Sequence, residues 1–229
     1  MDKSTIRPTR KKVEKFQDSG YDPYVYHNGT LQNKLGITDY QTLNAKEKEL
    51  LAERIVTPEL VKGQRMDTNL LRQIHKFYFE PIFDWAGEYR TVPLFKLESF
   101  FIPGISVTYS NPKDIKKELS DAIKSLNSVR WKRLEDWQIA REFVMHLTKI
   151  WKVHPFRDGN TRAVLGFAKI YALEHGFPLN MTVLTNLLSR PEKDGKVIGY
   201  SIRDMFVGAC IEEAPEPEHL IKVFQKSMI

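Results

Sequence analysis

The sequence contains one cysteine, Cys210, among 229 residues. A single thiol excludes a disulfide within the chain, and it excludes a zinc site built from several cysteines. The fold must therefore be stabilised by a hydrophobic core, and 41% hydrophobic residues are enough to build one. We expect Cys210 to be a small core residue in its reduced form, which suits a cytoplasmic protein.

Long apolar runs are also missing. No stretch of 18 consecutive apolar residues is present, so no segment has the length and hydrophobicity of a membrane span. The first residues, MDKSTIRPTRKKVEK, are basic but lack the apolar stretch that follows in a secretory signal. We predict a cytoplasmic protein without a membrane partner.

The positive charge has no matching nucleic-acid motif. The formal net charge is +6, and the basic residues Arg7, Arg10, Lys11 and Lys12 lie near the start. Such a charge favours acidic partners, nucleic acid included. However, no recognised nucleic-acid-binding motif, Walker-type glycine loop, zinc spacing or Ser-His-Asp order accompanies it. We do not expect nucleic acid to be the substrate, and we interpret the basic start as a solvated tail or helix face.

Helical patterns dominate what is present. Capping residues and apolar side chains at helical spacing predict helices over residues 42–54, 67–79, 114–127, 135–154, 161–174, 181–188 and 201–211, and a last amphipathic helix with Leu220, Phe224 and Met228 in line. The helix over 161–174 is apolar on nearly all sides, so we expect it to be central and buried. The chain is therefore predicted to be mainly α.

One segment interrupts the helices. Residues 87–109, GEYRTVPLFKLESFFIPGISVTY, are rich in β-branched and aromatic residues and are broken by Pro93, Pro103 and Gly104. This composition predicts a short β-hairpin, and we expect it to hold the only strand pairing of the chain. The hairpin either serves a functional purpose or simply covers the core.

A short polar segment, HPFRDGNTR, lies between two apolar helices. His154 precedes a proline, which ends the helix before it, and its imidazole can be neutral near pH 7 and accept a proton from a hydroxyl. Asp158 supplies the hard oxygen ligand that Mg²⁺ prefers. We expect Phe156 to point inward and to fix the loop. The segment thus combines a base with a metal ligand.

The second half of this segment suits an anion. Asp158, Gly159 and Asn160 form a turn that lets backbone N–H groups converge at the start of the next helix, where the helix dipole favours negative charge. Arg162, in the first turn, adds a charge-assisted contact. Together with His154 these groups describe phosphate-transfer chemistry. The alternative is an ordinary interhelical turn in which each residue has only a structural role.

Histidine and tryptophan residues also occur outside the polar segment. His75 and His146 fall within predicted helices, and we interpret both as structural or exposed side chains. We assign four aromatic residues to the core: Trp85, Trp131, Trp137 and Trp151.

The polar segment resembles the signature of the Fic family, His-x-Phe-x-Asp/Glu-Gly-Asn-Gly-Arg with a second Arg three residues further. FDWAGEYRTVPLFK (83–96) resembles the family's flap, and YDPYVYHNGTLQNKLGITD resembles the entry of bacterial Fic proteins named for cell filamentation. The resemblance implies a Fic-type helical bundle around a catalytic loop, with a short β-hairpin flap. It implies a single domain over 1–229, composed of an N-terminal lobe (1–50), a core (51–211) and a C-terminal helix (212–229).

The resemblance also implies a function. Fic proteins typically transfer AMP from ATP to a Tyr, Ser or Thr hydroxyl of a target protein, with Mg²⁺ as cofactor. His154 would be the base and Asp158 the Mg²⁺ ligand. The residues that would hold the nucleotide phosphates are Gly159, Asn160, Thr161 and Arg162. The flap residues that would position the target are Val92, Pro93, Leu94, Phe95 and Lys96.

Two positions depart from the family signature. Thr161 stands where the family has Gly, so its hydroxyl either caps the helix or crowds the phosphates. Leu165 stands where the family has the second Arg, which holds the far end of the triphosphate. Three alternatives follow: weaker use of ATP, transfer from another donor such as a CDP-linked alcohol, or a catalytically weak module that binds a nucleotide or partner.

Control of the activity is the last expectation. Many Fic enzymes are restrained by a helix with the pattern Ser/Thr-x-x-x-Glu-Gly/Asn, yet no Glu of this sequence is followed by Gly or Asn. We therefore predict a small antitoxin-like partner in trans, the alternative being an activity too low to need restraint. Such a partner would dock on the irregular start or on the stripe of Leu220, Phe224 and Met228.

Overall fold

The computed structural model describes residues 22–96, 107–212 and 214–229, so the basic segment near the start lies outside the described residues. Its helices are α2 (Tyr40–Ala52), α3 (Thr68–Phe79), α4 (Ile115–Asn127), α5 (Asp136–Val153), α6 (Asn160–Glu174), α7 (Met181–Thr185), α8 (Ile202–Cys210) and α9 (Glu218–Ser227). Two 3-10 turns, Glu59–Val61 and Trp131–Arg133, lie in the connections. The predicted mainly α fold is confirmed.

Capping side chains define the helix starts, as the sequence indicates. Asp39 accepts a hydrogen bond of 2.7 Å from the backbone N–H of Thr42 at the start of α2. Asp67 accepts from the N–H of Asn69 at 2.8 Å at the start of α3. Each carboxylate satisfies an N–H group that has no acceptor within its own helix.

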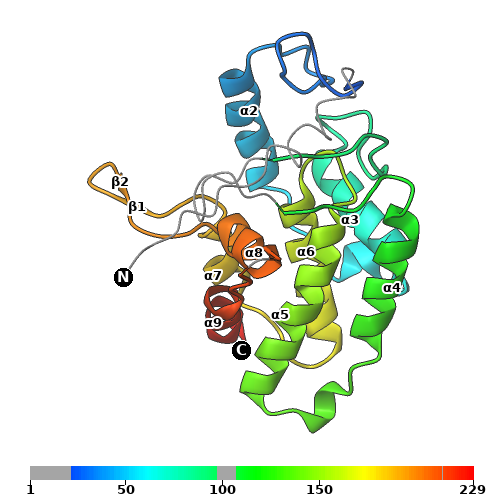
Figure 1. The fold of residues 1–229 in the computed structure, drawn as a ribbon, viewed down its shortest axis with the longest axis vertical. Coiled ribbons are helices and arrows are strands. Elements are labelled where there is room, and N and C mark those ends of the chain that lie inside the picture. Colours follow the sequence, from blue (N-terminus) through cyan, green and yellow to red (C-terminus); the bar gives the residue numbers. More distant parts are fainter. Residues whose placement is uncertain (1–21, 97–106, 213) are drawn as a thin grey trace, which may run out of the picture.

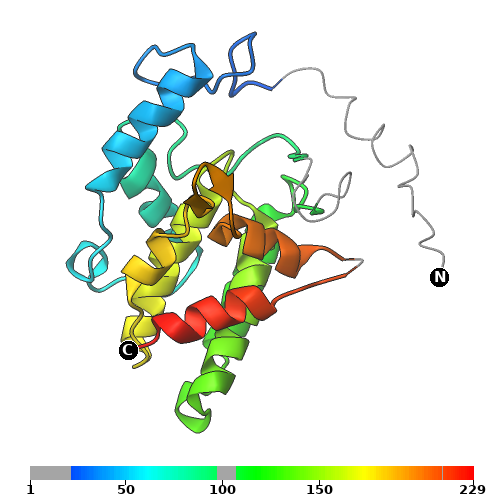
Figure 2. The same cartoon turned by 90° about the vertical axis from the view of Figure 1, so that its left-hand side faces the viewer.

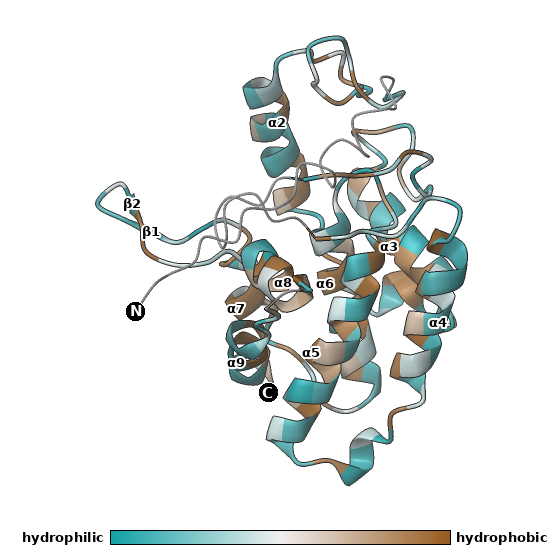
Figure 3. Ribbon diagram, viewed as in Figure 1, coloured by the Kyte–Doolittle hydropathy of each residue, from teal (hydrophilic) through white to brown (hydrophobic). Residues whose placement is uncertain are grey.

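α5 and α6 form the centre of the bundle (Figure 1). α4 packs along α5, α3 packs against α6, and α9 lies across α5, as the turned view in Figure 2 also shows. α6 is buried along most of its length, as predicted. Figure 3 shows hydrophobic and hydrophilic stretches alternating on α4 and α5, as expected of helices with one buried face. The loop between α5 and α6 therefore sits on a rigid base.

The predicted hairpin position is wrong in the described part of the chain. Residues 87–96 and 107–109 contain no strand, and residues 97–106 lie outside the described residues. The described strand pair instead joins β1 (Glu192–Lys193) to β2 (Lys196–Val197) on an arm that projects from the bundle (Figure 1). Its turn, Asp194-Gly195, has φ of 52° and 71°, the geometry for which Asp-Gly is favoured.

Burial confirms most of the predicted core and corrects one member. Cys210 is buried, as are Trp131 and Trp151, whereas the side chain of Trp137 is 58% exposed at the start of α5. Trp137 was therefore wrongly assigned to the core. No helix among the described residues is long and apolar enough to cross a membrane.

Candidate active site

The polar loop joins the end of α5 to the start of α6. His154 ends α5 in the left-handed conformation, with φ of 49°, and turns the chain away from the helix axis. Arg157, in the middle of the loop, forms an ion pair with Asp22 at 2.7 Å, which links the loop to the N-terminal segment. The loop is thus anchored at its start and at its centre.

The His154 side chain is 2% exposed. Its Nδ1 lies 3.3 Å from the carbonyl of Trp151, and the Tyr109 ring packs over it with centroids 4.1 Å apart. Burial, together with the positive charges of Lys96 and Arg90, holds the pKa of His154 well below its ordinary value. The imidazole is therefore neutral at pH 7.

Asn160 and Phe156 form the inner brace of the loop. Phe156 is fully buried, as predicted. The Asn160 side chain accepts from the Phe156 N–H at 2.9 Å and donates to the Phe156 carbonyl at 2.8 Å. Because both ends of this amide are hydrogen-bonded to the backbone of Phe156, the side chain of Asn160 shapes the loop.

Asp158 and Gly159 form the outer part of the loop. The Asp158 side chain is 44% exposed, and its Oδ1 accepts from the Gly159 N–H at 2.9 Å. Gly159 has φ of 74°, and a Cβ added there would lie 2.2 Å from the Phe79 ring. Both the conformation and the close approach require glycine at this position.

Arg162 lies in the first turn of α6, between α2 and α3. Its guanidinium lies 5.9 Å from the centre of the Tyr78 ring. Burial lowers the pKa of Arg162, while Tyr78 and Glu47 raise it. Burial and, to a smaller extent, the negative charge of Asp158 raise the pKa of the Glu47 carboxyl to about 7, although the positive charge of Arg162 opposes this rise. α2 thus brings a carboxyl into the electrostatic field of the loop, which we did not predict.

The flap residues run as an extended segment beside the loop. Pro93 and Phe95 are exposed and Leu94 between them is buried, the alternation expected of an extended chain. The carbonyl of Val92 accepts a hydrogen bond from Arg90. Lys96 reaches the loop, with Nζ 3.9 Å from Oδ1 of Asp158. The structure therefore brings the predicted flap and the predicted metal ligand together.

Arg90 holds this segment against the end of α5. Its side chain is 2% exposed, and Nε donates to the His154 carbonyl at 2.8 Å. Nη1 donates to the Val92 carbonyl at 2.8 Å, and Nη2 donates to the Ser110 carbonyl. Burial lowers the pKa of Arg90 to about 10, so it stays charged at pH 7. We assigned it no role, because a single sequence carries no signal for a buried arginine that serves backbone carbonyls.

Thr161 and Leu165, the two residues that depart from the family signature, both have contacts within the fold. The Thr161 hydroxyl accepts a hydrogen bond of 3.0 Å from the indole N–H of Trp151. The hydroxyl is therefore not the helix cap, because Gly159 holds that position. Leu165 is 2% exposed and belongs to the core.

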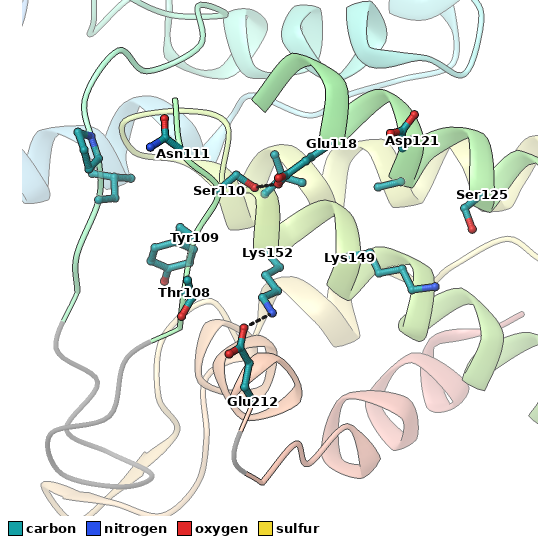
Figure 4. Close-up of a pocket in the computed structure, with 14 residues that line it drawn as sticks. Thr108, Tyr109, Ser110, Asn111, Glu118, Asp121, Ser125, Lys149, Lys152 and Glu212 are labelled. Atoms are coloured by element: carbon teal, nitrogen blue, oxygen red, sulfur yellow. Dashed lines mark hydrogen bonds and ion pairs between the residues drawn. The ribbon is translucent and has the colours of Figure 1, made fainter. Parts of the chain in front are cut away.

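A hollow of about 1080 Å³ lies on the α4 side of the flap (Figure 4). Pro93 and Leu94 line one part of it, and Glu118 of α4 and Lys152 of α5 line others. In Figure 4, Glu118 meets Ser110, and Lys152 forms an ion pair of 2.8 Å with Glu212. Tyr109 lies between this hollow and His154. The hollow therefore adjoins the candidate base without opening directly onto it.

Comparison with known proteins agrees with this geometry. The Fic/DOC family model matches residues 65–172. A probable protein adenylyltransferase Fic of Escherichia coli K12 is 27% identical over 211 residues, 90% of this chain and 99% of that protein. A protein of the same name in Salmonella typhimurium LT2 is 30% identical over 208 residues, 90% of this chain and 99% of that protein. The crystal structure of BepC, a VirB-translocated effector of Bartonella tribocorum with bound AMPPNP, shares the fold with a TM-score of 0.69 at 22% identity, over 90% of this chain and 96% of that one. The chain belongs to the Fic/DOC family.

Proposed function

We propose that the chain is a protein adenylyltransferase that transfers AMP from ATP to a Tyr, Ser or Thr hydroxyl of a target protein. Relatives of this name match the chain over 99% of their own length. The observation that carries the proposal is the position of His154, whose Nδ1 lies 3.3 Å from the Trp151 carbonyl. With the proton on Nδ1, the lone pair of Nε2 accepts the proton of an attacking hydroxyl.

In the proposed reaction, the target's hydroxyl oxygen forms a bond to the α-phosphorus of ATP. The bond from that phosphorus to the bridging oxygen breaks, and pyrophosphate leaves with the electron pair. His154 takes the proton of the hydroxyl. Its lowered pKa keeps it neutral and able to accept that proton at pH 7.

Asp158 fits a magnesium ligand. Its carboxylate is partly exposed beside the start of α6, where the phosphates would lie. No group of three or more acidic, histidine or cysteine side chains that could hold a metal occurs among the described residues. One carboxylate is enough when the phosphates and water complete the coordination of Mg²⁺. When bound, the ion neutralises phosphate charge and stabilises the transition state.

The start of α6 would hold the phosphates. Its first backbone hydrogen bond runs from the Ala163 N–H to the Gly159 carbonyl at 3.0 Å. The N–H groups of Asn160, Thr161 and Arg162 therefore have no acceptor within the helix and can bind an anion. The Arg162 guanidinium adds positive charge in the same turn.

The flap would position the target. Pro93 and Phe95 are exposed on either side of the buried Leu94, so an extended target peptide would pair along this stretch. Lys96 and Val92 fix the ends of this stretch through Asp158 and Arg90. The exposed residues between them would then contact the target.

The buried Leu165 favours a second candidate, a transferase with another donor. Because Leu165 lies in the core, position 165 supplies no cation for the far end of a triphosphate. A donor with two phosphates, such as a CDP-linked alcohol, needs no such contact. Incubating the pure protein and a bacterial lysate with ATP, CTP or CDP-choline and measuring the mass added to proteins decides the donor. A mass gain of AMP from ATP alone supports the first proposal, and no added mass from any donor contradicts both.

A small partner in trans would control the activity. The stripe of Leu220 and Phe224 is buried in the chain's own core, so that suggested docking surface is wrong. The N-terminal segment remains, and the Arg157–Asp22 ion pair connects it to the loop. Expression of the chain alone and with its neighbouring open reading frame tests this part of the proposal. Equal growth and equal labelling in both, without a co-purifying small protein, would contradict it.

A further inference from the structure

His75 of α3 lies beneath the loop and is completely buried. Its Nδ1 accepts a hydrogen bond of 2.8 Å from the backbone N–H of Gly87, which lies within the flap segment 83–96. Its Nε2 lies 3.0 Å from the backbone carbonyl of Asp158. One imidazole therefore contacts the backbone of two segments, the flap and the loop.

The two contacts define which nitrogen of the His75 ring carries the proton. Because an amide N–H donates to Nδ1, that nitrogen carries no proton, and the proton of the neutral ring lies on Nε2. Nε2–H then donates to the Asp158 carbonyl. The neutral form also suits the complete burial of the ring, because burial disfavours a charged imidazole.

The peptide that His75 binds also controls the Asp158 side chain. The carbonyl of Asp158 and the N–H of Gly159 belong to one planar peptide unit, so fixing the direction of the carbonyl fixes that of the N–H. This N–H donates to Oδ1 of Asp158 at 2.9 Å. By orienting the Asp158–Gly159 peptide, the hydrogen bond from His75 also sets the direction of the N–H that holds the Asp158 carboxylate.

We propose that His75 is a positioning residue for the metal-binding carboxylate, acting through the Asp158–Gly159 peptide and connecting that carboxylate to the flap segment at Gly87. The inference rests on the proposed function, in which Asp158 binds Mg²⁺. An orienting hydrogen bond next to a metal ligand typically changes metal affinity about 10- to 100-fold.

Packing alone does not account for this arrangement. The His75 ring stacks on Phe156 with centroids 3.8 Å apart and lies 4.7 Å from the Phe79 ring. A phenylalanine would serve such stacking without leaving polar atoms in the core. The two hydrogen bonds need an acceptor and a donor on opposite sides of one ring, which phenylalanine lacks.

Two substitutions separate the two hydrogen bonds. His75→Gln places an amide N–H near the position of Nε2 and can keep the bond to Asp158, whereas His75→Asn places an acceptor near Nδ1 and keeps only the bond to Gly87. Mg²⁺ affinity is measured by calorimetry in the presence of ATP, and ATP binding is also measured without metal. Melting curves accompany each titration. His146→Gln and His146→Asn, at a buried histidine of α5 away from the loop, are the matched controls.

We expect His75→Asn to weaken Mg²⁺ binding by about 10-fold or more, and His75→Gln to stay within about threefold of wild type at a similar melting temperature. The His146 pair should not differ from each other. If both His75 variants lose Mg²⁺ affinity equally, or if neither loses any, the inference is overturned. The proposed function still stands in that case, provided that the wild-type chain binds Mg²⁺ with ATP. A wild-type chain that binds no Mg²⁺ with ATP overturns both. Should the variants fail to fold, ¹⁵N NMR of the wild-type ring decides, since a proton on Nδ1 contradicts the inference.

Discussion

The indole N–H of Trp151 donates a hydrogen bond of 3.0 Å to the hydroxyl of Thr161. Trp151 is fully buried near the end of α5, and Thr161 lies in the first turn of α6, so this bond spans the polar loop from one helix to the other. It explains why a hydroxyl suits the position where the Fic signature has glycine. Without it the buried indole N–H would lack this acceptor.

Thr161→Gly should therefore destabilise the protein despite restoring the family residue. Loss of the acceptor for a buried N–H costs about 1–3 kcal/mol, and glycine in a helix adds up to about 1 kcal/mol. Thr161→Ser keeps the hydroxyl and is the matched control. Urea unfolding of the three proteins checks this, and an unchanged midpoint for Thr161→Gly would show that the bond contributes nothing.

Leu165→Arg should not restore a phosphate contact. Leu165 is 2% exposed, so arginine would place an unpaired charge in the core. We expect a loss of more than about 3 kcal/mol of stability, whereas Leu165→Met should lose less than about 1.5 kcal/mol. A melting curve and an ATP titration of the same variant test this. Tighter ATP binding at an unchanged melting temperature would mean that this position faces the nucleotide.

Glu47→Gln should raise stability above neutral pH. The folded-state pKa of Glu47 is raised from 4.5 to about 7, so the fold binds an extra proton between these values and loses stability as pH rises through them. The variant should exceed wild type by roughly 1–3 kcal/mol at pH 8 and match it near pH 4.5.

Glu49→Gln, on the same helix and exposed, is the control for the loss of one negative charge. Urea unfolding at both pH values measures the difference. A stability gain for Glu47→Gln that is equal at pH 4.5 and pH 8 would mean that ionisation of Glu47 is not its cause.

The sequence predicted what local patterns determine. Asp39 and Asp67 mark helix starts because their partners are two or three residues away. The loop His154–Arg162 was found because its groups lie within nine consecutive positions. The β1–β2 hairpin forms around Asp194-Gly195, a local turn signal that our sequence analysis did not use.

The remaining features depend on contacts between distant residues. His75 meets Asp158, 83 positions later, and Arg90 meets His154, 64 positions later. The sequence around His75 or Arg90 does not indicate these partners, because each side chain binds a backbone carbonyl, a group that every residue has. The positioning of the loop could therefore be seen only in the folded chain.

His154→Asn tests the central claim most directly. Asparagine tolerates the left-handed conformation at this position, where φ is 49°, so the fold should be kept. Wild type and variant are incubated with a bacterial lysate and ATP labelled at the α-phosphate, and incorporation into protein is measured beside a melting curve of each. We predict labelling by wild type and a loss of about 100-fold or more in the variant at a similar melting temperature. Equal labelling by a folded His154→Asn variant would contradict the role of His154 as the base.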